Sequence, residues 1–206
     1  MPEFSEEGER RELTMLFADV RGFTPFSEYQ SPDVIFATLN LYLRAMIQSV
    51  LNESGMIDKI IGDAVMAIFG VMPTGGIAAD HAIRAAIRML DSVREVNLQQ
   101  MKQGHSPLDI GIGVATGPVV VGYLGTKDRR TFSVIGHHVN LAARLESQAR
   151  TGEILIDDNT YRSATDPVKS RFSMTHLTLK GFSSSSRAYT SRPASTDSQN
   201  TVKFSL

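Results

Sequence analysis

The order of its predicted elements places this 206-residue chain in the α+β class, with a ferredoxin-like core. Three features carry that prediction: an apolar run at residues 13–18, a helix-periodic stretch after Ser31, and two short apolar runs around Gly62-Asp63. With the helix and strand that follow, they make the order β-α-β-β-α-β, the split βαβ arrangement. This topology brings the end of the first strand beside the turn between the second and third.

The first helix has a clear start and a repeating apolar face. Ser31 suits the N-cap, Pro32 the first helical position, and Asp33 the positive end of the helix dipole. We expect the helix to stop near Gly55. Its apolar residues recur at close to the helical period, which predicts core packing against a sheet: Ile35, Leu39, Tyr42, Leu43, Met46, Ile47 and Val50.

Residues 58–70 predict a hairpin whose two-residue turn is Gly62-Asp63. The flanking runs are rich in Ile, Val, Met and Phe, which is typical of strands buried on both faces. Lys59 lies four residues before Asp63, about 13 Å along an extended strand, so each charge needs its own partner. Taken alone, an ordinary hairpin with a turn Asp and an edge Lys explains this stretch.

The remaining elements continue the same pattern. We expect Asp80 to cap a second long helix that ends by Gly104, with Ile83, Ala86, Ile87, Leu90, Val93 and Leu98 on its inner side. Later strands are predicted at 108–116, 118–124 (paired with the one before), 131–135, 154–157, 171–179 and 187–190, with helices at 139–149 and near 158–164.

Gly111 and Gly113 have the first part of a dinucleotide-binding pattern, but they fall inside a predicted strand and no third glycine follows at the required spacing. We interpret them as small residues that allow a partner or a nucleotide to approach closely.

Composition narrows the class of protein. Hydrophobic residues make up 42% and charged residues 21%, which is ordinary for a globular domain. The net charge of −1 favours neither nucleic acid nor an anionic membrane as partner. The absence of cysteine excludes disulfides and thiolate metal sites. We expect a flexible lead (1–10), one catalytic domain (11–191) and a disordered tail (192–206).

No leader or membrane segment is expected in this chain. The start of the chain is acidic and polar, unlike a signal peptide, and the longest apolar run, at 64–72, is too short to span a bilayer. We therefore expect the domain to be cytoplasmic, with an upstream regulatory domain in a full-length protein that could itself be membrane-attached.

Two Asp residues suggest the chemistry. Asp19 ends the first apolar strand and Asp63 lies in the hairpin turn, so the topology sets two carboxylates side by side. Adjacent carboxylates repel unless a cation lies between them, and hard oxygen ligands favour Mg²⁺ or Mn²⁺. The loop after Asp19 offers backbone N–H groups to phosphates. Together these features indicate phosphoryl or nucleotidyl transfer.

Three stretches then match one family in the right order. Residues 17–24 (FADVRGFT) resemble the first metal motif of class III nucleotidyl cyclases, 59–70 resemble the second, and 135–146 resemble the transition-state motif. The resemblance spans about 11–190. It implies the class III cyclase fold, with additional strands and helices after the ferredoxin-like core. It also implies conversion of ATP to 3′,5′-cyclic AMP and pyrophosphate.

The resemblance assigns roles by position. Two Mg²⁺ or Mn²⁺ ions would be held by Asp19, Asp63 and the carbonyl of Val20. Asn140 would orient the ribose, and Arg144 would neutralise charge on the α-phosphate. These two share one helix face, which by itself would read as an ordinary polar surface. The phosphate contacts implied are Gly22, Phe23, Thr24 and Lys180.

The resemblance also implies a head-to-tail homodimer in which each site takes its metal pair from one subunit and its Asn/Arg pair from the other. Lys59, grouped with Asn140 and Arg144, can donate to adenine N1. Ser133, seven residues before Asn140, can accept from the adenine N6 amino group. This pair favours ATP over GTP.

Several alternatives stay open. A guanylate cyclase, or a non-catalytic cyclase-like domain that binds nucleotide or a regulatory partner, shares the fold. A diguanylate cyclase would need a different turn from the one at Gly62-Asp63, and a two-metal phosphohydrolase would form a linear product. His137-His138 stands where relatives often have Gly-Asp leading into the helix, and we expect it to affect helix stability or pH response. A metal site at these adjacent histidines is disfavoured.

Overall fold

The computed structural model describes residues 8–72, 75–126, 128–177 and 186–191. The described helices are α1 (Phe23–Glu28), α2 (Pro32–Asn52), α3 (Ala78–Lys102), α4 (His137–Gln148), α5 (Asp158–Ser163) and α6 (Asp166–Lys169). The described strands are β1 (Glu9–Arg21), β2 (Met56–Ile61), β3 (Ala64–Phe69), β4 (Asp109–Thr126), β5 (Arg129–Ile135), β6 (Glu153–Asp157), β7 (Ser173–Leu177) and β8 (Ser186–Thr190). The predicted tail at 192–206 lies outside the described residues.

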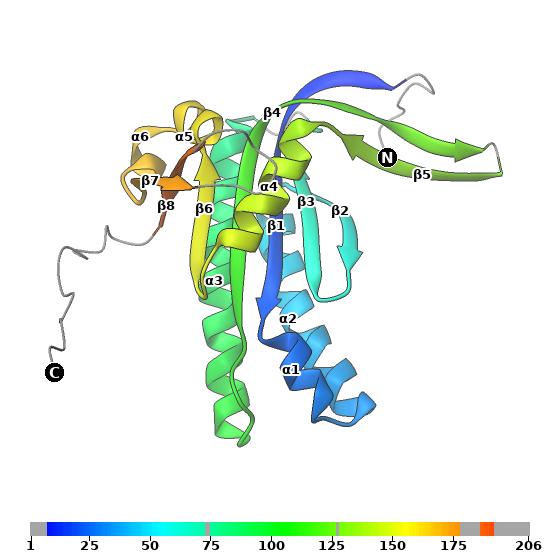
Figure 1. Ribbon diagram of the computed structural model, residues 1–206, viewed down its shortest axis with the longest axis vertical. Coiled ribbons are helices and arrows are strands. Elements are labelled where there is room, and N and C mark those ends of the chain that lie inside the picture. The colour runs from blue at the N-terminus through cyan, green and yellow to red at the C-terminus, as the bar shows by residue number, and fades with distance from the viewer. Residues whose placement is uncertain (1–7, 73–74, 127, 178–185, 192–206) are drawn as a thin grey trace, which may run out of the picture.

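The described strands form one eight-stranded sheet in the order β2-β3-β1-β4-β6-β8-β7, with β5 paired to β4 (Figure 1). β1 lies between β3 and β4 and is antiparallel to both. This is the predicted ferredoxin-like arrangement, extended by β6, β8 and β7. Since Asp19 pairs with Ala64, the end of β1 lies beside the β2–β3 turn, as the topology predicts.

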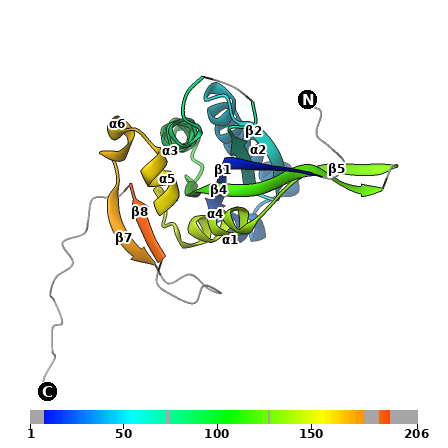
Figure 2. The ribbon, with the colours of Figure 1, turned by 90° about the horizontal axis from the view of Figure 1, so that it is seen from above.

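Helices cover both faces of the sheet (Figure 2). Alternate residues of β1 point to opposite faces: Leu16 and Ala18 pack in the core beneath α2 and α3, while Leu13 and Met15 pack in the core beneath α4. All four are at most 1% exposed. Asp19 and Arg21 follow Met15 at even spacing, so both belong to the face that carries α4.

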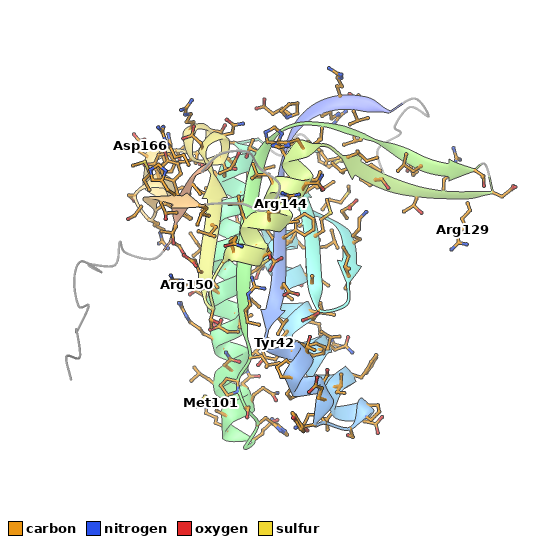
Figure 3. All side chains as sticks on the ribbon, viewed as in Figure 1. Tyr42, Met101, Arg129, Arg144, Arg150 and Asp166 are labelled. Carbon is orange, nitrogen blue, oxygen red and sulfur yellow. The ribbon has the colours of Figure 1, made fainter. Side chains whose placement is uncertain are left out.

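Helix α2 is anchored through Tyr42, which is labelled in Figure 3 and fully buried. Its hydroxyl donates to Asn97 Oδ1 on α3 at 2.6 Å and accepts from the Leu108 N–H at 3.0 Å. Among the described residues α2 alone is long and apolar enough to cross a membrane. Because Tyr42, Met46 and Val50 are completely buried inside the domain, we assign α2 to the protein core.

The prediction of two strands at 108–116 and 118–124 was wrong. Both stretches belong to the single strand β4, and it is β5 that pairs with the later part. Pro118 is tolerated because β4 is locally unpaired on its outer side: the ladder to β6 ends at Val114 and the ladder to β5 begins at Val120. β5 and the part of β4 that pairs with it, residues 120–126, project from the body as an arm (Figure 1).

Other expectations need smaller corrections. β3 is buried as predicted, but β2 is a sheet edge with Ile60 and Ile61 about half exposed. Asp80 lies in the first turn of α3, where it accepts from the N–H and hydroxyl of Thr165 instead of capping the helix. After α2 the left-handed residue is Ser54, one position before Gly55. The sequence also did not predict α1 or α6.

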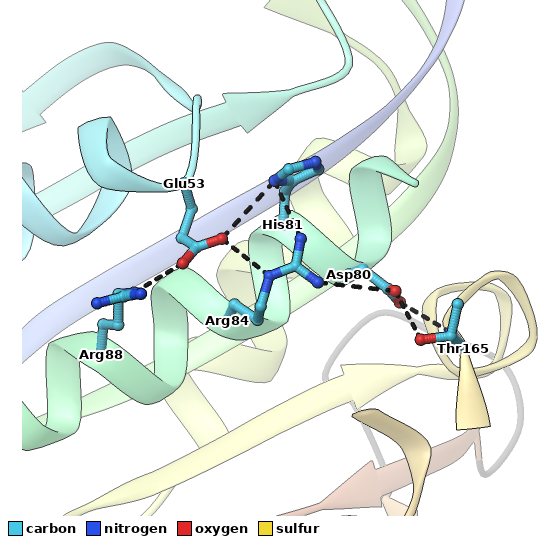
Figure 4. A network of polar contacts seen from close by, with 6 residues as sticks. All are labelled: Glu53, Asp80, His81, Arg84, Arg88 and Thr165. Atoms are coloured by element: carbon cyan, nitrogen blue, oxygen red, sulfur yellow. Dashed lines mark hydrogen bonds and ion pairs between the residues drawn. The ribbon is translucent and has the colours of Figure 1, made fainter. Parts of the chain in front are cut away.

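A network of charged side chains ties the end of α2 to α3 and α6 (Figure 4). Glu53, with only 8% of its side chain exposed, pairs with Arg84 at 2.9 Å and Arg88 at 2.6 Å. Burial disfavours the charged carboxylate, but the hydrogen bonds from both arginines outweigh burial and hold the pKa of Glu53 below its usual 4.5.

Glu53→Gln is expected to lower the free energy of unfolding at neutral pH by about 2 kcal/mol, since half of each arginine remains in water. A depressed carboxyl pKa contributes stability above the unfolded value and loses it as pH falls. The difference between wild type and variant should therefore shrink below about pH 4.5. Urea denaturation of wild type and variant at several pH values measures this difference. Asp91→Asn, which removes an exposed ion pair with Arg94, is the control. A difference that does not change with pH would contradict the assignment.

Candidate active site

Asp19 and Asp63 meet at one edge of the α4 face. Asp19 lies opposite Ala64 in β3 and Gly111 in β4. Asp63 follows Gly62, whose positive φ of 62° suits the tight turn. Burial and the charge of Asp63 raise the pKa of the Asp19 carboxyl, while Arg21 lowers it. The two carboxylates are thus close enough to repel, as the sequence predicts.

Arg21 is a part of this site that the sequence reasoning missed. Its Nη1 donates to Asp19 Oδ2 at 2.9 Å, and its Nη2 lies 2.6 Å from Glu146 Oε1 and donates to the carbonyls of Glu146 and Ala149. Its position two residues after Asp19, on the same face of a strand, was the available signal.

Glu146 on α4 feels the charge of both carboxylates. Its side chain is only 13% exposed. Burial raises the pKa of the Glu146 carboxyl, the Arg21 guanidinium lowers it, and Asp19 and Asp63 raise it further. Arg21 therefore pairs with Asp19 and with Glu146, and the negative charge of Asp63 acts on both carboxyl groups.

Gly111 and Gly113 leave room for the contact between Arg21 and Glu146. A methyl carbon added at Gly111 would lie 2.6 Å from Arg21 Cζ, and one added at Gly113 would lie 2.8 Å from the Cα of Glu146. Both distances are shorter than real contacts. The sequence predicted the approach of a partner or a nucleotide at these glycines, and the structure instead places an arginine and a helix of the same chain there.

The proposed phosphate segment begins a short helix. Gly22, with φ 79°, is the N-cap of α1, and Phe23 and Thr24 form its first turn. The first turn of a helix leaves backbone N–H groups without helical partners, and the binding of phosphate by Gly22, Phe23 and Thr24 stays a prediction. The N–H of Val20 faces the Asp19 carboxyl. Lys180 lies outside the described residues.

Asn140 and Arg144 stand on α4. Asn140 is exposed, and Arg144, which is labelled in Figure 3, is half-buried. The helix begins at His137, after an N-cap, Gly136, that provides no side-chain hydrogen bond. His137 is exposed, whereas the ring of His138 occupies the space where a side chain at position 117 would be. Because Gly136 is the N-cap, an acid at position 137 would stand in the first turn of α4 and not at its cap, which corrects the expectation of a missing capping residue.

Lys59 has a partner that the sequence reasoning missed. Its Nζ lies 3.1 Å from Asp58 Oδ2, and the Asp58 side chain is fully buried. The pairing of β2 with β3 shifts register between Ile57 and Lys59, so Asp58 occupies a bulge. Burial raises the pKa of Asp58 and the charge of Lys59 lowers it. Ser133 is half-buried on β5, where it pairs with Gly122.

The metal expectation rests on two carboxylates. Among the described residues no three His, Asp or Glu side chains gather as a metal-binding group. Asp19 and Asp63 nevertheless fit a divalent cation: their oxygens are hard ligands, and they repel one another without a cation between them. Substrate phosphates and water normally complete such a shell.

Comparisons with known proteins agree with the fold and the motifs. Residues 6–189 match the family described as "Adenylate and Guanylate cyclase catalytic domain". The crystal structure of the adenylyl cyclase CyaB from P. aeruginosa is similar at 36% identity and a TM-score of 0.81, over 89% of this chain and 94% of that one. The guanylyl cyclase Cya2 is similar at 35% identity and a TM-score of 0.81, over 89% and 92%. The chain belongs to the adenylate and guanylate cyclase catalytic domain family.

Among curated proteins, an adenylate cyclase of Anabaena cylindrica is 38% identical over 76% of this chain and 32% of its own length. Adenylate cyclase 1 of Rhizobium meliloti is 33% identical over 66% of this chain and 21% of its own length. The chain thus spans a third or less of the length of these relatives.

Proposed function

We propose that this domain converts ATP to 3′,5′-cyclic AMP and pyrophosphate. The 3′-oxygen attacks the α-phosphorus, the new O3′–P bond forms, the bond to the bridging oxygen breaks, and the 3′-hydroxyl proton is lost. The single observation that carries the proposal is the convergence of Asp19 and Asp63 at the end of β1 beside the α1 N-terminus. The family and the similarity to an adenylyl cyclase support it.

Two Mg²⁺ or Mn²⁺ ions would be held by Asp19, Asp63 and the carbonyl of Val20. Bound there, divalent ions lower the pKa of the attacking hydroxyl and stabilise charge on the phosphates. The backbone N–H groups of Gly22, Phe23 and Thr24 would bind the phosphate tail. Lys180 remains a proposed phosphate contact.

We place Asn140 and Arg144 of one chain in the site of a second, in a head-to-tail homodimer. In support, one chain leaves apolar side chains exposed on the arm and on the β2 edge: Ile60, Ile61, Val120, Leu124 and Ile135 are 40–54% exposed. Arg144 would neutralise charge building on the α-phosphate, and Asn140 would orient the ribose.

Adenine would be read by Lys59 and Ser133. The Lys59 ammonium, which lies 3.1 Å from Asp58 Oδ2, would donate to adenine N1. Guanine carries a proton on N1 and would oppose that donor. A guanylate cyclase stays the second candidate, because the similar structures include one at nearly equal identity.

Lys59→Glu is expected to lower kcat/KM for ATP by about 100-fold and to raise the ratio of cyclic GMP to cyclic AMP, because a carboxylate accepts from guanine N1. Kinetics with each nucleotide test this, with Lys102→Glu on α3 as control. An unchanged product ratio would remove Lys59 from base selection.

Product analysis tests the function itself. The purified chain is incubated with ATP or GTP and Mn²⁺, and the nucleotides are separated. Cyclic AMP from ATP, with little cyclic GMP from GTP, supports the proposal. A linear product would point to a phosphohydrolase. No cyclic product from a chain that is dimeric and binds nucleotide would favour the non-catalytic regulatory alternative.

We also propose that the domain works in the cytoplasm, under an upstream regulatory domain. The greater length of the curated relatives supports further domains in proteins of this family.

A further inference from the structure

We propose that Arg21 is a positioning residue that locks helix α4 to the metal-binding strand β1 by bridging Asp19 and Glu146. The inference rests on the proposed cyclase function, because α4 carries the residues expected to act on the α-phosphate. None of the family motifs, as matched by position, gives Arg21 or Glu146 a role.

The bridge uses the shape of the guanidinium. One nitrogen, Nη1, contacts Asp19 Oδ2 at 2.9 Å, and the other, Nη2, contacts Glu146 Oε1 at 2.6 Å and the Ala149 carbonyl at 3.1 Å. The Arg21 side chain is 23% exposed, so these contacts are largely shielded from water. A planar fork can hold separate partners at a fixed angle, which a lysine ammonium cannot do equally well.

The contact to the Ala149 carbonyl adds a second function. The C-terminal end of a helix has carbonyls without helical partners and a partial negative charge. Ala149 is the C-cap of α4, and Arg21 Nη2 also reaches the carbonyl of Glu146 in the last turn. Arg21, 128 positions before Ala149, therefore caps the C-terminal end of α4 as well as pairing with the Glu146 side chain.

The β4 strand is shaped for this bridge. At Gly111 a side chain would collide with the guanidinium, and at Gly113 it would collide with the backbone of α4. Gly111 also lies directly opposite Asp19 in the ladder. Two glycines at alternate positions thus open a channel on one face of the sheet, in which the arginine and the helix end both fit.

The location of Glu146 makes the bridge relevant to catalysis. Glu146 follows Arg144 by two residues on the same helix. Because a helix is rigid over so short a distance, holding Glu146 against β1 also sets the position and direction of Arg144 relative to β1. In the proposed head-to-tail dimer, Arg144 acts in the partner's site while Asp19 acts in its own. Within each chain, the bridge would then connect Asp19, which acts in that chain's own site, to the helix whose Arg144 acts in the partner's site.

Four variants of the full chain test this: Arg21→Gln, Glu146→Gln, the double variant, and Gly111→Ala, which removes no charge but displaces the guanidinium. We expect each single change to lower kcat by about 100-fold, because small misplacement of catalytic groups is costly. KM for ATP should change less than about threefold, and the double variant should lose no more than the worse single. Arg21→Lys should restore part of the loss.

Arg150→Gln, just beyond the end of the same helix and exposed, is the matched control and should keep wild-type rates. Full activity in Glu146→Gln, or losses that multiply in the double variant, would overturn the proposal.

Hydrogen exchange provides a readout that needs no turnover. Amides of the last turn of α4, including Ala149, should exchange faster in Arg21→Gln and Glu146→Gln than in wild type or Arg150→Gln. Unchanged exchange would show that no bridge holds the helix. If wild type forms no cyclic AMP, the proposed function fails, while the exchange result still decides whether the bridge exists.

Discussion

Replacing Asp19 or Asp63 by alanine is expected to lower cyclic AMP formation by at least about 1,000-fold, the largest single-residue effect that we predict. Each change removes one of the two carboxylates that would hold the divalent ions, so activation of the 3′-hydroxyl and stabilisation of the phosphates fail together. The fold should remain, because burial and the charge of Asp63 already disfavour the ionised form of Asp19. Kinetics with ATP and Mn²⁺ measure the loss.

Ligand-induced thermal stabilisation provides a second readout for these variants. Mn²⁺ with a non-reactive ATP analogue should raise the unfolding midpoint of wild type but not of Asp19→Ala or Asp63→Ala, since ligands stabilise only the state that binds them. Asp91→Ala, an exposed carboxylate on α3, is the matched control and should behave as wild type. Near-normal turnover in either site variant would remove the metal assignment.

Mixing two inactive chains is expected to restore activity. Asp63→Ala chains keep Arg144, and Arg144→Ala chains keep Asp63, so a mixed head-to-tail dimer contains one complete site. Random assortment at equal concentration makes half of the dimers mixed, and one of their two sites is intact, so recovery should approach about a quarter of wild-type activity. Each variant alone should be nearly inactive. The measurement is cyclic AMP formation after mixing and equilibration.

The control for the mixture combines Asp63→Ala with Asp19→Ala. Both changes fall in the same half of the site, so no mixed dimer has an intact site and no recovery is expected. Recovery in this control, or its absence in the first mixture when mixed dimers are shown to form, would contradict the shared-site arrangement. Each chain would then have to supply its own Arg144.

Elements with strong local signals were predictable. Helix α2 follows from Ser31-Pro32 and a regular apolar stripe, and the hairpin follows from Gly62-Asp63 between two apolar runs. Because those elements fix the split βαβ order, the nearness of Asp19 and Asp63 could also be inferred. Local signals failed at Gly117-Pro118, where a typical strand breaker lies inside β4. Whether a proline is tolerated depends on which side of the strand has a partner.

The sequence by itself determined the β-α-β-β-α-β order of the core, the two carboxylates at the end of β1 and in the hairpin turn, and the motifs that identify the family. Only the tertiary structure decided which residues surround those carboxylates. Arg21 and Glu146 are 125 positions apart in the chain, and Gly111 and Gly113 leave the space in which they meet. Local propensity reports on a residue's neighbours in the chain, whereas a bridge between a strand and a distant helix depends on how closely the packed sheet lets that helix approach.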